Sequence, residues 1–339
     1  MKNFLQVVVF GDSLTWSPGV AMGERYADFL EKNLQDMCTD QWYCDVAACG
    51  DGGNTAEEGL SRIQRDCLSY NPHIVVLNFG ANDSVRAPSK QQFMECYRKI
   101  INTIKHSATN HIILETTPTL DQQWHSQKNN PSAIFYGGLE NYLEFFSHSF
   151  IRETAKLEDL ILYDRFSLYH QKISEQPCLR EKWIQKDGVH LTGEGNRFFA
   201  EGLASIIKTI IPEIHLVQTN PETWLEDALL NPVYIECCES LQTGRLKEYL
   251  SEPQGLKRLM LQKTRSFSRR AMAFADNEEL QNKAYTAYCL ASGFMAAERI
   301  YTSQDKEISE KSVRWAMSYL KNIPENNLIQ KLIEIFEKL

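Results

Sequence analysis

Leu5-Gln6-Val7-Val8-Val9-Phe10-Gly11-Asp12-Ser13, residues 5–13, is the stretch around which the first part of this 339-residue chain is organised. The apolar, β-branched run that ends at Phe10 is typical of a strand buried on both faces of a parallel sheet. Gly11 and Asp12 are turn residues that end this strand. A serine in the turn after a central strand lies where open α/β sheets bind ligands, at the carboxyl ends of the strands. Ser13 is therefore the first candidate nucleophile.

Three further polar clusters follow in the same region, next to apolar runs or helical patterns. They are Gly52-Gly53-Asn54-Thr55, Gly80-Ala81-Asn82-Asp83 and Asp187-Gly188-Val189-His190. Together with Gly11-Asp12-Ser13-Leu14, and in this order, these blocks resemble those of the SGNH hydrolases, the GDSL family of esterases and lipases. The resemblance covers residues 1–212. It implies a flavodoxin-like three-layer sandwich with a five-stranded parallel sheet.

Length and composition restrict the classes of protein to consider. A chain of 339 residues exceeds the usual size of a single core, so we expect two domains. A hydrophobic content of 43% and a net charge of -8 suit an ordinary globular protein and argue against a nucleic-acid partner. No apolar run approaches the roughly 20 residues that span a bilayer. The first strand begins so close to Met1 that no signal peptide is expected before the serine turn.

The cysteines predict a reducing compartment. All nine are scattered singly apart from Cys237-Cys238, and their number is odd. This pattern favours buried free thiols over a disulfide framework, so we expect a cytoplasmic protein. No CxxC pair is present and the histidines do not cluster with the cysteines, so we expect no metal and no other cofactor.

Short apolar runs alternate with helical patterns through residues 1–212. We expect strands over residues 5–10, 43–49, 73–79, 111–116 and 160–163. We expect helices over residues 19–37, 55–68, 88–106 and 137–157, and one that Thr192 caps. Such alternation implies a parallel sheet with helices on both faces. A long polar loop over residues 119–136 is predicted to form the rim of a site, and residues 168–182 are predicted to be irregular.

Strand signals cease after Pro212, and the chain from there on is predicted to be an all-α domain. We place the domain boundary between Pro212 and Pro221, giving domains over residues 1–212 and 221–339. Helices are expected near residues 222–230, 234–250, 256–276, 279–301, 311–320 and 328–339. We expect a packed domain that lies near the site and affects the choice among large substrates. If the interface between the two domains is small, a chain break at the boundary is expected to leave residues 1–212 folded.

One stretch of this helical region, residues 257–270, holds six basic residues and no acid. It could bind an anionic head group or a membrane surface. A solvated helix face opposite acidic neighbours is the interpretation we favour. Peripheral contact with a membrane or a protein through the helical domain stays open.

An acyl hydrolase needs a nucleophile, a base, a group that orients the base, and donors for the oxyanion. Ser13 is the candidate nucleophile, His190 the base and Asp187 the orienting acid. For the oxyanion hole we expect the backbone N–H groups of Ser13 and Gly53, because glycine lets a backbone approach a reacting carbonyl closely. The side-chain amide of Asn82 is the expected third donor.

A plain structural interpretation exists for each of these residues taken alone. Ser13, Gly53 and Asn82 are common turn residues, and His190 could be a solvated loop histidine. Their joint occurrence at the ends of successive strands favours a site. Asp12 and Thr15 are interpreted as supporting or turn groups, and Asp83 as a turn residue.

The predicted function is that of a serine esterase in EC class 3.1, which cleaves a carboxylic ester or thioester through an acyl-enzyme on Ser13. The resemblance allows a lipase, lysophospholipase, thioesterase or acetylesterase, so a small-molecule ester or a lipid is the expected substrate. An alternative hypothesis is a non-catalytic SGNH-based binding protein whose helical domain recognises a protein or lipid partner.

Overall fold

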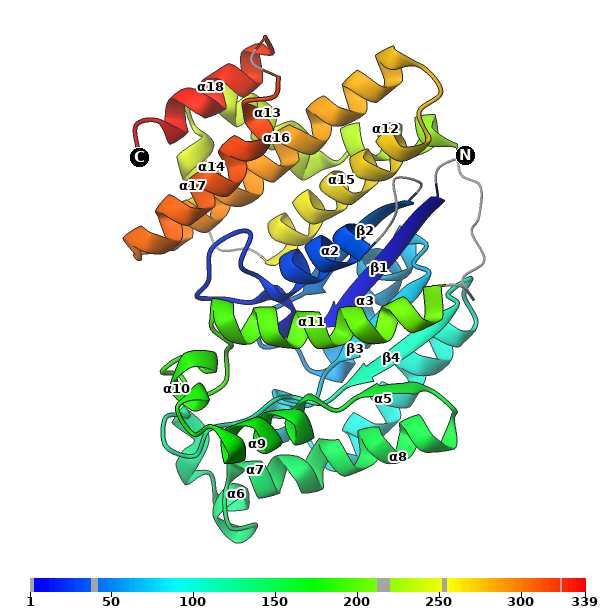
Figure 1. Ribbon diagram of the computed structural model, residues 1–339, viewed down its shortest axis with the longest axis vertical. Coiled ribbons are helices and arrows are strands. Elements are labelled where there is room, and N and C mark those ends of the chain that lie inside the picture. The colour runs from blue at the N-terminus through cyan, green and yellow to red at the C-terminus, as the bar shows by residue number, and fades with distance from the viewer. Residues whose placement is uncertain (1–2, 38–41, 212–219, 252–254, 324) are drawn as a thin grey trace. The chain divides into compact units, whose positions relative to one another are not determined.

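The computed structural model describes residues 3–37, 42–211, 220–251, 255–323 and 325–339. The chain divides into two compact units. One takes residues 6–19 and 48–215 and is called the sheet unit here; the other takes residues 1–5, 20–47 and 216–339 and is called the helical unit. Strands β1 (Asn3–Gly11) and β2 (Trp42–Gly50) each have residues in both units (Figure 1).

A five-stranded parallel sheet forms the centre of the fold, as the sequence predicted. Its other strands are β3 (Ile74–Asn78), β4 (His111–Glu115) and β5 (Ile161–Tyr163), and the strand order is β2-β1-β3-β4-β5. In the register, Val8 of β1 pairs with Val75 of β3, and Val75 pairs in turn with Ile112 of β4. The direction of strand addition reverses beside β1, which makes the carboxyl end of β1 the switch point where such sheets place their sites.

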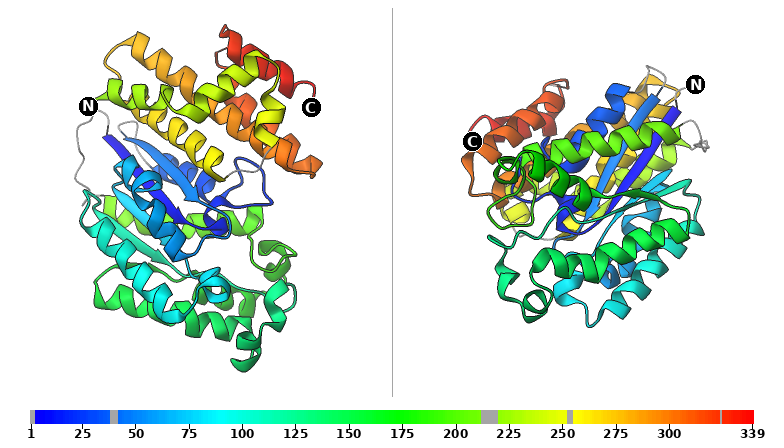
Figure 2. Two further views of the ribbon diagram at one scale, coloured as in Figure 1. Left: turned by 180° about the vertical axis from the view of Figure 1, so that it is seen from behind. Right: turned by 60° about the horizontal axis from the view of Figure 1, so that its bottom comes forward.

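Helices cover both faces of the sheet. Helices α3 (Ala56–Asp66), α5 (Lys90–Lys105) and α8 (Ser149–Leu157) lie on one face, and α11 (Gly193–Ile210) lies on the other (Figures 1 and 2). Each turns an apolar side inward, for example Phe199 and Leu203 of α11. The Thr192 hydroxyl accepts the N–H of Gly195 at 3.2 Å, so this residue caps α11 as predicted.

The connections between the strands and the covering helices contain more short helices than the sequence indicated. These are α1 (Ser13–Trp16), η1 (Leu68–Tyr70), α4 (Asp83–Arg86), η2 (Ser126–Asn129), α6 (Pro131–Phe135), α7 (Leu139–Leu143), the π-helical turn η3 (Glu144–His148), α9 (Arg165–Glu175) and α10 (Leu179–Trp183). The prediction that residues 168–182 are irregular is wrong, because α9 and α10 occupy most of them. Asp164 starts α9 by accepting the N–H of Ser167.

Two predicted helices are shorter or less regular than expected. The helix predicted from Gly19 begins only at Tyr26, as α2 (Tyr26–Met37). Gly19 and Gly23 have φ values of +71° and +87°, a left-handed conformation that a regular helix does not contain. The helix predicted over residues 137–157 is divided among α7, η3 and α8.

The region after residue 220 is helical, as predicted. It contains α12 (Pro221–Leu229), α13 (Pro232–Gln242), α14 (Leu246–Ser251), α15 (Gly255–Phe274), α16 (Glu278–Thr302), α17 (Lys306–Leu320) and α18 (Asn327–Phe336). Helix α16 packs along α15 and α17, and all its residues from 287 to 300 are buried. Gly244, with φ +74°, ends the helix predicted over residues 234–250 and separates α13 from α14. Among the described helices, none has the length and apolar character needed to cross a membrane.

The basic stretch of α15 takes part in buried ion pairs within the helical unit. Arg265 is 2% exposed and donates to Glu31 of α2 at 2.9 Å, and Arg269 also pairs with Glu31. Burial by itself opposes ionisation of Glu31, but the two guanidinium groups outweigh it and lower the pKa of Glu31 to about 2. The favoured interpretation of a solvated helix face is therefore wrong for these arginines.

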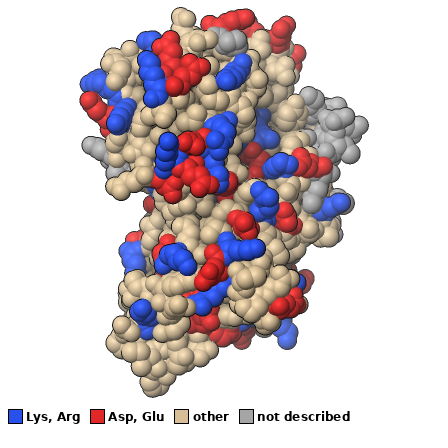
Figure 3. Space-filling model, turned by 60° about the vertical axis from the view of Figure 1, so that its left-hand side comes forward, with Lys and Arg blue, Asp and Glu red and all other residues tan. Residues whose placement is uncertain are grey.

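Acidic and basic side chains lie interspersed on the face drawn in Figure 3.

This division of the chain bears on the predicted domain boundary. Residues 212–219 lie outside the described residues, so the boundary itself stays a prediction. The helical unit also takes residues 20–47, and α2 shares the Glu31 ion pairs with α15. A break between Pro212 and Pro221 would therefore separate Glu31 from its two arginines.

We expect Arg265→Ala to destabilise the protein by about 3–5 kcal/mol, because it leaves the Glu31 carboxylate buried with one partner fewer. Denaturant unfolding followed by circular dichroism measures this change. Lys247→Ala, at an exposed position of α14, is the matched control and should have almost no effect. Equal stability of Arg265→Ala and the wild type would show that the ion pair is not part of the folded core.

Candidate active site

Ser13 lies in a turn that two local interactions define. The Asp12 carboxylate accepts the N–H of Leu14 at 2.9 Å, which makes Asp12 the cap of α1 and Ser13 its first residue. Gly11 precedes this turn, and a side chain there would overlap the Asn78 carbonyl of β3. These contacts explain why the strand stops at Gly11 and why the serine follows directly at the carboxyl end of β1.

The turn between α10 and α11 places a histidine and an aspartate beside Ser13. Oδ1 of Asp187 accepts the backbone N–H groups of Val189 and His190, both at 3.0 Å. Asp187 Oδ2 lies 2.6 Å from His190 Nδ1, and His190 Nε2 lies 2.9 Å from Ser13 Oγ. The structure thus brings together the three residues that the sequence singled out.

The charge state of Asp187 fixes the direction of these hydrogen bonds. Burial opposes its ionisation, but the hydrogen bonds from the His190 ring and from the Val189 N–H outweigh burial and lower the pKa of Asp187 to about 2. An ionised carboxylate only accepts hydrogen bonds, so His190 Nδ1 donates to it. In the neutral imidazole, Nε2 then carries a lone pair directed at the Ser13 hydroxyl.

The side chain of Gln185 links the segment after Ser13, called the serine turn here, to the turn that carries Asp187 and His190, called the histidine turn here. Its Nε2 donates to the Pro18 carbonyl at 2.8 Å and to the Leu191 carbonyl at 2.7 Å. The backbone N–H of Gln185 also donates to the carbonyl of His190 at 2.8 Å. At Gly19, a Cβ would overlap the Gln185 amide, so a glycine is required for this approach. Gln185 thereby holds the turn that carries Ser13 and the turn that carries His190 in one arrangement. Gln185 was not predicted from the sequence.

We expect Gln185→Glu to lower kcat about 10- to 100-fold, because a carboxylate would face two carbonyl oxygens and misplace His190 relative to Ser13. Steady-state kinetics with a short soluble ester measures the effect, and KM should change little. Gln171→Glu, an exposed change on α9, is the control. An unchanged kcat for Gln185→Glu would show that the backbone alone positions the two turns.

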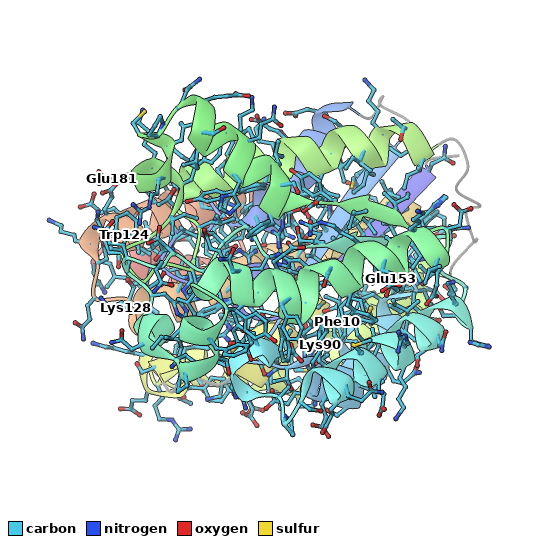
Figure 4. All side chains as sticks on the ribbon, turned by 90° about the horizontal axis from the view of Figure 1, so that it is seen from below. Phe10, Lys90, Trp124, Lys128, Glu153 and Glu181 are labelled. Carbon is cyan, nitrogen blue, oxygen red and sulfur yellow. The ribbon has the colours of Figure 1, made fainter. Side chains whose placement is uncertain are left out.

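The loop after β4 contacts the same histidine turn, in agreement with its predicted place at the rim of a site. The N–H of Asp121 donates to the Gly188 carbonyl at 2.7 Å, and the Asp121 carboxylate binds Arg180 through contacts of 2.5 and 2.6 Å. Two cations lie close to the Trp124 ring, the Arg180 guanidinium at 4.8 Å and the Lys186 ammonium at 4.1 Å. Figure 4 shows Trp124 at the edge of the molecule from which Lys128 also projects.

Of the predicted oxyanion donors, Asn82 contacts the residue that precedes Ser13. Asn82 Nδ2 donates to the Asp12 carboxylate at 3.0 Å and to the Asn54 carbonyl at 3.2 Å. Asp12 is 1% exposed, and this burial raises its pKa to about 6. Gly53 has a φ of +78°. Within the described residues, the backbone N–H groups of Ser13 and Gly53 have no protein acceptor.

Asp83 and Arg62 hydrogen-bond to the segments that surround Ser13 and Gly53. The Asp83 carboxylate accepts the N–H of Ala56 at the start of α3, and burial is the main cause that raises the pKa of Asp83 to about 7. Asp83 is therefore more than the turn residue that we predicted. Arg62 donates to the Gly11 carbonyl at 2.6 Å and to the Asn54 side chain at 2.7 Å.

Arg62 was not predicted from the sequence, although a signal was present. Arg62 and Asp66 are spaced four residues apart on the apolar side of the predicted helix over residues 55–68, where charged residues are unusual. At the outer edge of the site, Arg86 donates to the Gly53 carbonyl and pairs with Glu58. In the described part of the chain, no group of three His, Cys, Asp or Glu side chains could hold a metal ion.

This fold, with a Ser-His-Asp arrangement at the carboxyl end of the central strand, has the geometry of the serine hydrolases. The model of the GDSL-like lipase/acylhydrolase family matches residues 9–198, more than half of the 339 residues. The chain therefore belongs to this family, which confirms the resemblance noted in the sequence. The helices after α11 lie outside the match.

Distant relatives carry names from the same area of chemistry. The chain is 23% identical over 207 residues to "Thioesterase 1/protease 1/lysophospholipase L1" of Escherichia coli K12, covering 60% of this chain and 84% of that protein. It is 22% identical over 205 residues to an arylesterase of Vibrio mimicus, covering 59% and 86%. A lipase/acylhydrolase structure from Enterococcus faecalis aligns with a TM-score of 0.48 and 22% identity, covering 63% of this chain and all of that chain.

Proposed function

We propose that this protein is a serine esterase that cleaves a carboxylic ester or thioester through an acyl-enzyme on Ser13. The observation that carries the proposal is the line of contacts from Asp187 through His190 to Ser13, with distances of 2.6 and 2.9 Å. A serine hydroxyl is a weak nucleophile unless an adjacent base accepts its proton. Here Ser13 Oγ and His190 Nε2 lie within hydrogen-bond distance.

The first half of the reaction transfers the acyl group to the enzyme. Ser13 Oγ attacks the substrate carbonyl carbon while His190 Nε2 accepts the hydroxyl proton. Asp187 stabilises the imidazolium that forms, because its pKa of about 2 keeps it ionised at neutral pH. When the tetrahedral intermediate collapses, the bond to the alcohol or thiol breaks and His190 protonates the leaving group.

The second half returns the enzyme to its starting state. A water molecule gives its proton to His190 Nε2 and attacks the acyl-enzyme carbonyl. Collapse of this second tetrahedral intermediate breaks the bond to Ser13 Oγ, which takes the proton back from His190. The products are a carboxylic acid and free Ser13, and the proposed reaction uses no cofactor.

The proposed oxyanion donors are the backbone N–H groups of Ser13 and Gly53 and the side-chain amide of Asn82. In the free protein, both hydrogens of the Asn82 amide are directed at Asp12 and Asn54. Donation to an oxyanion therefore requires Asn82 to exchange or share one of these bonds. The Asp12 carboxylate keeps the amide nitrogen directed toward the serine turn.

We expect Asn82→Ala to lower kcat by about 100- to 1,000-fold, because one preorganised donor to the oxyanion is removed. KM for a short ester should change little, since the donor acts mainly on the transition state. Steady-state kinetics at neutral pH measures both constants, and Asn102→Ala on α5 is a control outside the site. A fall in substrate affinity without a change in kcat would contradict this role.

The substrate class is proposed as esters or thioesters, with a lipid among the candidates. The names of the relatives, which include a thioesterase, a lysophospholipase and an arylesterase, support this range. A panel of p-nitrophenyl esters from acetate to palmitate, with acyl thioesters in parallel, tests it. Turnover of none of them, together with no reaction with a fluorophosphonate, would refute the proposed function and favour a binding protein.

We further propose a cytoplasmic location and a role for the helical region in selecting large substrates. All eight described cysteines are free and six of them are buried, which supports a reducing compartment. The helical unit is packed around α15 and α16, which supports a defined surface rather than a tail.

A further inference from the structure

Helix α6 carries two large apolar side chains that point into solvent. Ile134 is 65% exposed and Phe135 is 82% exposed; these two residues are called the α6 tip here. On the face drawn in Figure 3, the lowest part of the molecule, where α6 lies in Figure 1, shows no charged side chain. Behind the tip, Tyr136 stacks on Phe145 with their ring centroids 4.3 Å apart.

The segment around the tip carries little charge. Residues 122–139 contain no Asp or Glu, although the whole chain has 44 of them. Lys128 is the one lysine of the segment, and it is exposed. The acids that flank the segment both have partners: Asp121 binds Arg180, and Glu140 accepts the hydroxyl of Thr119. From α5, Lys90 places its ammonium 4.1 Å from the Phe145 ring.

The tip is held in place and is connected to the candidate active site. Asn130 caps α6 by accepting the N–H of Ser132 at 2.9 Å, and the Ala133 carbonyl accepts the N–H of Gly138 at 2.7 Å. The same segment begins next to Asp121, whose N–H donates to Gly188 in the histidine turn. The two exposed side chains therefore belong to a hydrogen-bonded loop whose first residues contact the turn that carries His190.

The size of the tip decides between possible partners. A stable protein–protein interface buries about 800 Å² on each partner, whereas even a fully exposed aromatic side chain offers only about 150–250 Å². Two side chains are therefore too small for a second copy of the chain or another protein. A lipid surface needs only a few apolar side chains at its boundary, and it tolerates lysines but not acids beside them.

We propose that the α6 tip inserts into the surface of a lipid bilayer and so brings the Ser13 site to ester groups at that surface. The second part of this statement rests on the proposed esterase function; insertion of the tip does not. Since hydrophobic contact drives binding of the α6 tip to the bilayer, binding should occur on zwitterionic bilayers and depend little on salt.

Sedimentation with phosphatidylcholine vesicles tests the insertion. The full-length Ser13→Ala protein is used, so that hydrolysis cannot alter the vesicles. We expect Ile134→Ser combined with Phe135→Ser to lower the partition coefficient at least about tenfold, because both apolar side chains are lost from the contact. Phe135→Leu, which keeps an apolar side chain, should retain most of the binding.

Leu157→Ser is the matched control, because Leu157 is an exposed apolar residue, at 75%, at the end of α8. It should leave vesicle binding unchanged, and thermal unfolding should show all variants to be folded. Absence of binding by the Ser13→Ala protein would overturn the proposal, as would an equal loss with Leu157→Ser. Binding confined to anionic vesicles and abolished by salt would also overturn it, because basic side chains would then be responsible.

The two proposals can fail separately. Vesicle binding through the tip without hydrolysis of any ester would refute the esterase function and leave the insertion supported. Hydrolysis of short soluble esters by a protein that does not bind vesicles would support the esterase function and refute the insertion.

Discussion

Replacing Ser13 with alanine is expected to lower kcat for ester hydrolysis by a factor on the order of 10⁶. The reason is geometric: Ser13 Oγ is the hydroxyl that lies 2.9 Å from the candidate base His190 Nε2. Without this oxygen no acyl-enzyme can form, although the oxyanion donors remain. Steady-state kinetics with p-nitrophenyl acetate measures the change.

The same substitution should leave stability almost unchanged, because Ser13 is only half-buried and one hydroxyl contributes little to packing. Ser61→Ala, at an exposed serine of α3, is the matched control and should retain full activity. Loss of activity together with loss of the folded state in Ser13→Ala would leave the chemical role unproven, so thermal unfolding belongs in the same experiment. Substantial residual hydrolysis by a folded Ser13→Ala protein would contradict a Ser13 nucleophile.

Replacing His190 with alanine should reduce kcat by a comparable factor, since a triad acts as a unit and loss of the base removes most of its effect. His106→Ala is the control, because His106 is an exposed histidine at the end of α5. Both variants should stay folded. If His190→Ala kept most of its activity, another group would have to accept the Ser13 proton.

The activity of the wild type and that of His190→Ala should depend differently on pH. Wild-type activity should fall at acidic pH, because a protonated imidazole cannot accept the Ser13 proton. Asp187 does not cause this fall, since its pKa of about 2 keeps it ionised down to much lower pH. The residual activity of His190→Ala should lack this acid limb. An unchanged pH profile in that variant would mean that a different group controls the rate.

The sheet and the Asp187–His190 pair could be predicted because both depend on local sequence, whereas the pairing of His190 with Ser13, 177 residues away, was expected from the family resemblance. The run from Val7 to Phe10 is buried throughout, and the turn that follows it places Ser13 at the strand end whatever surrounds it. Asp187 and His190 are three residues apart, so their contact needs only a tight turn. The predicted strands and the family resemblance were confirmed for these reasons.

The parts that were missed depend on contacts between distant residues. In the sequence, Gln185 has the pattern of an ordinary loop residue, because its contacts with Pro18 and Leu191 form only in the folded chain. Arg265 reads as solvated because its partner Glu31 is far away in the sequence. Short-range patterns carry no information about such partners. Helix α9 is a different case, because its cap is local: Asp164 accepts the N–H of Ser167, three residues further on, so this signal was present in the sequence.

The most direct test of the central claim is to identify the nucleophile chemically. The wild-type protein is treated with a fluorophosphonate, digested, and analysed by tandem mass spectrometry. We expect a single phosphonylated residue, Ser13, with labelling that falls in His190→Ala, because the serine is activated only by its base. A phosphonate on any other residue, or no adduct in a folded protein that hydrolyses esters, would contradict the account.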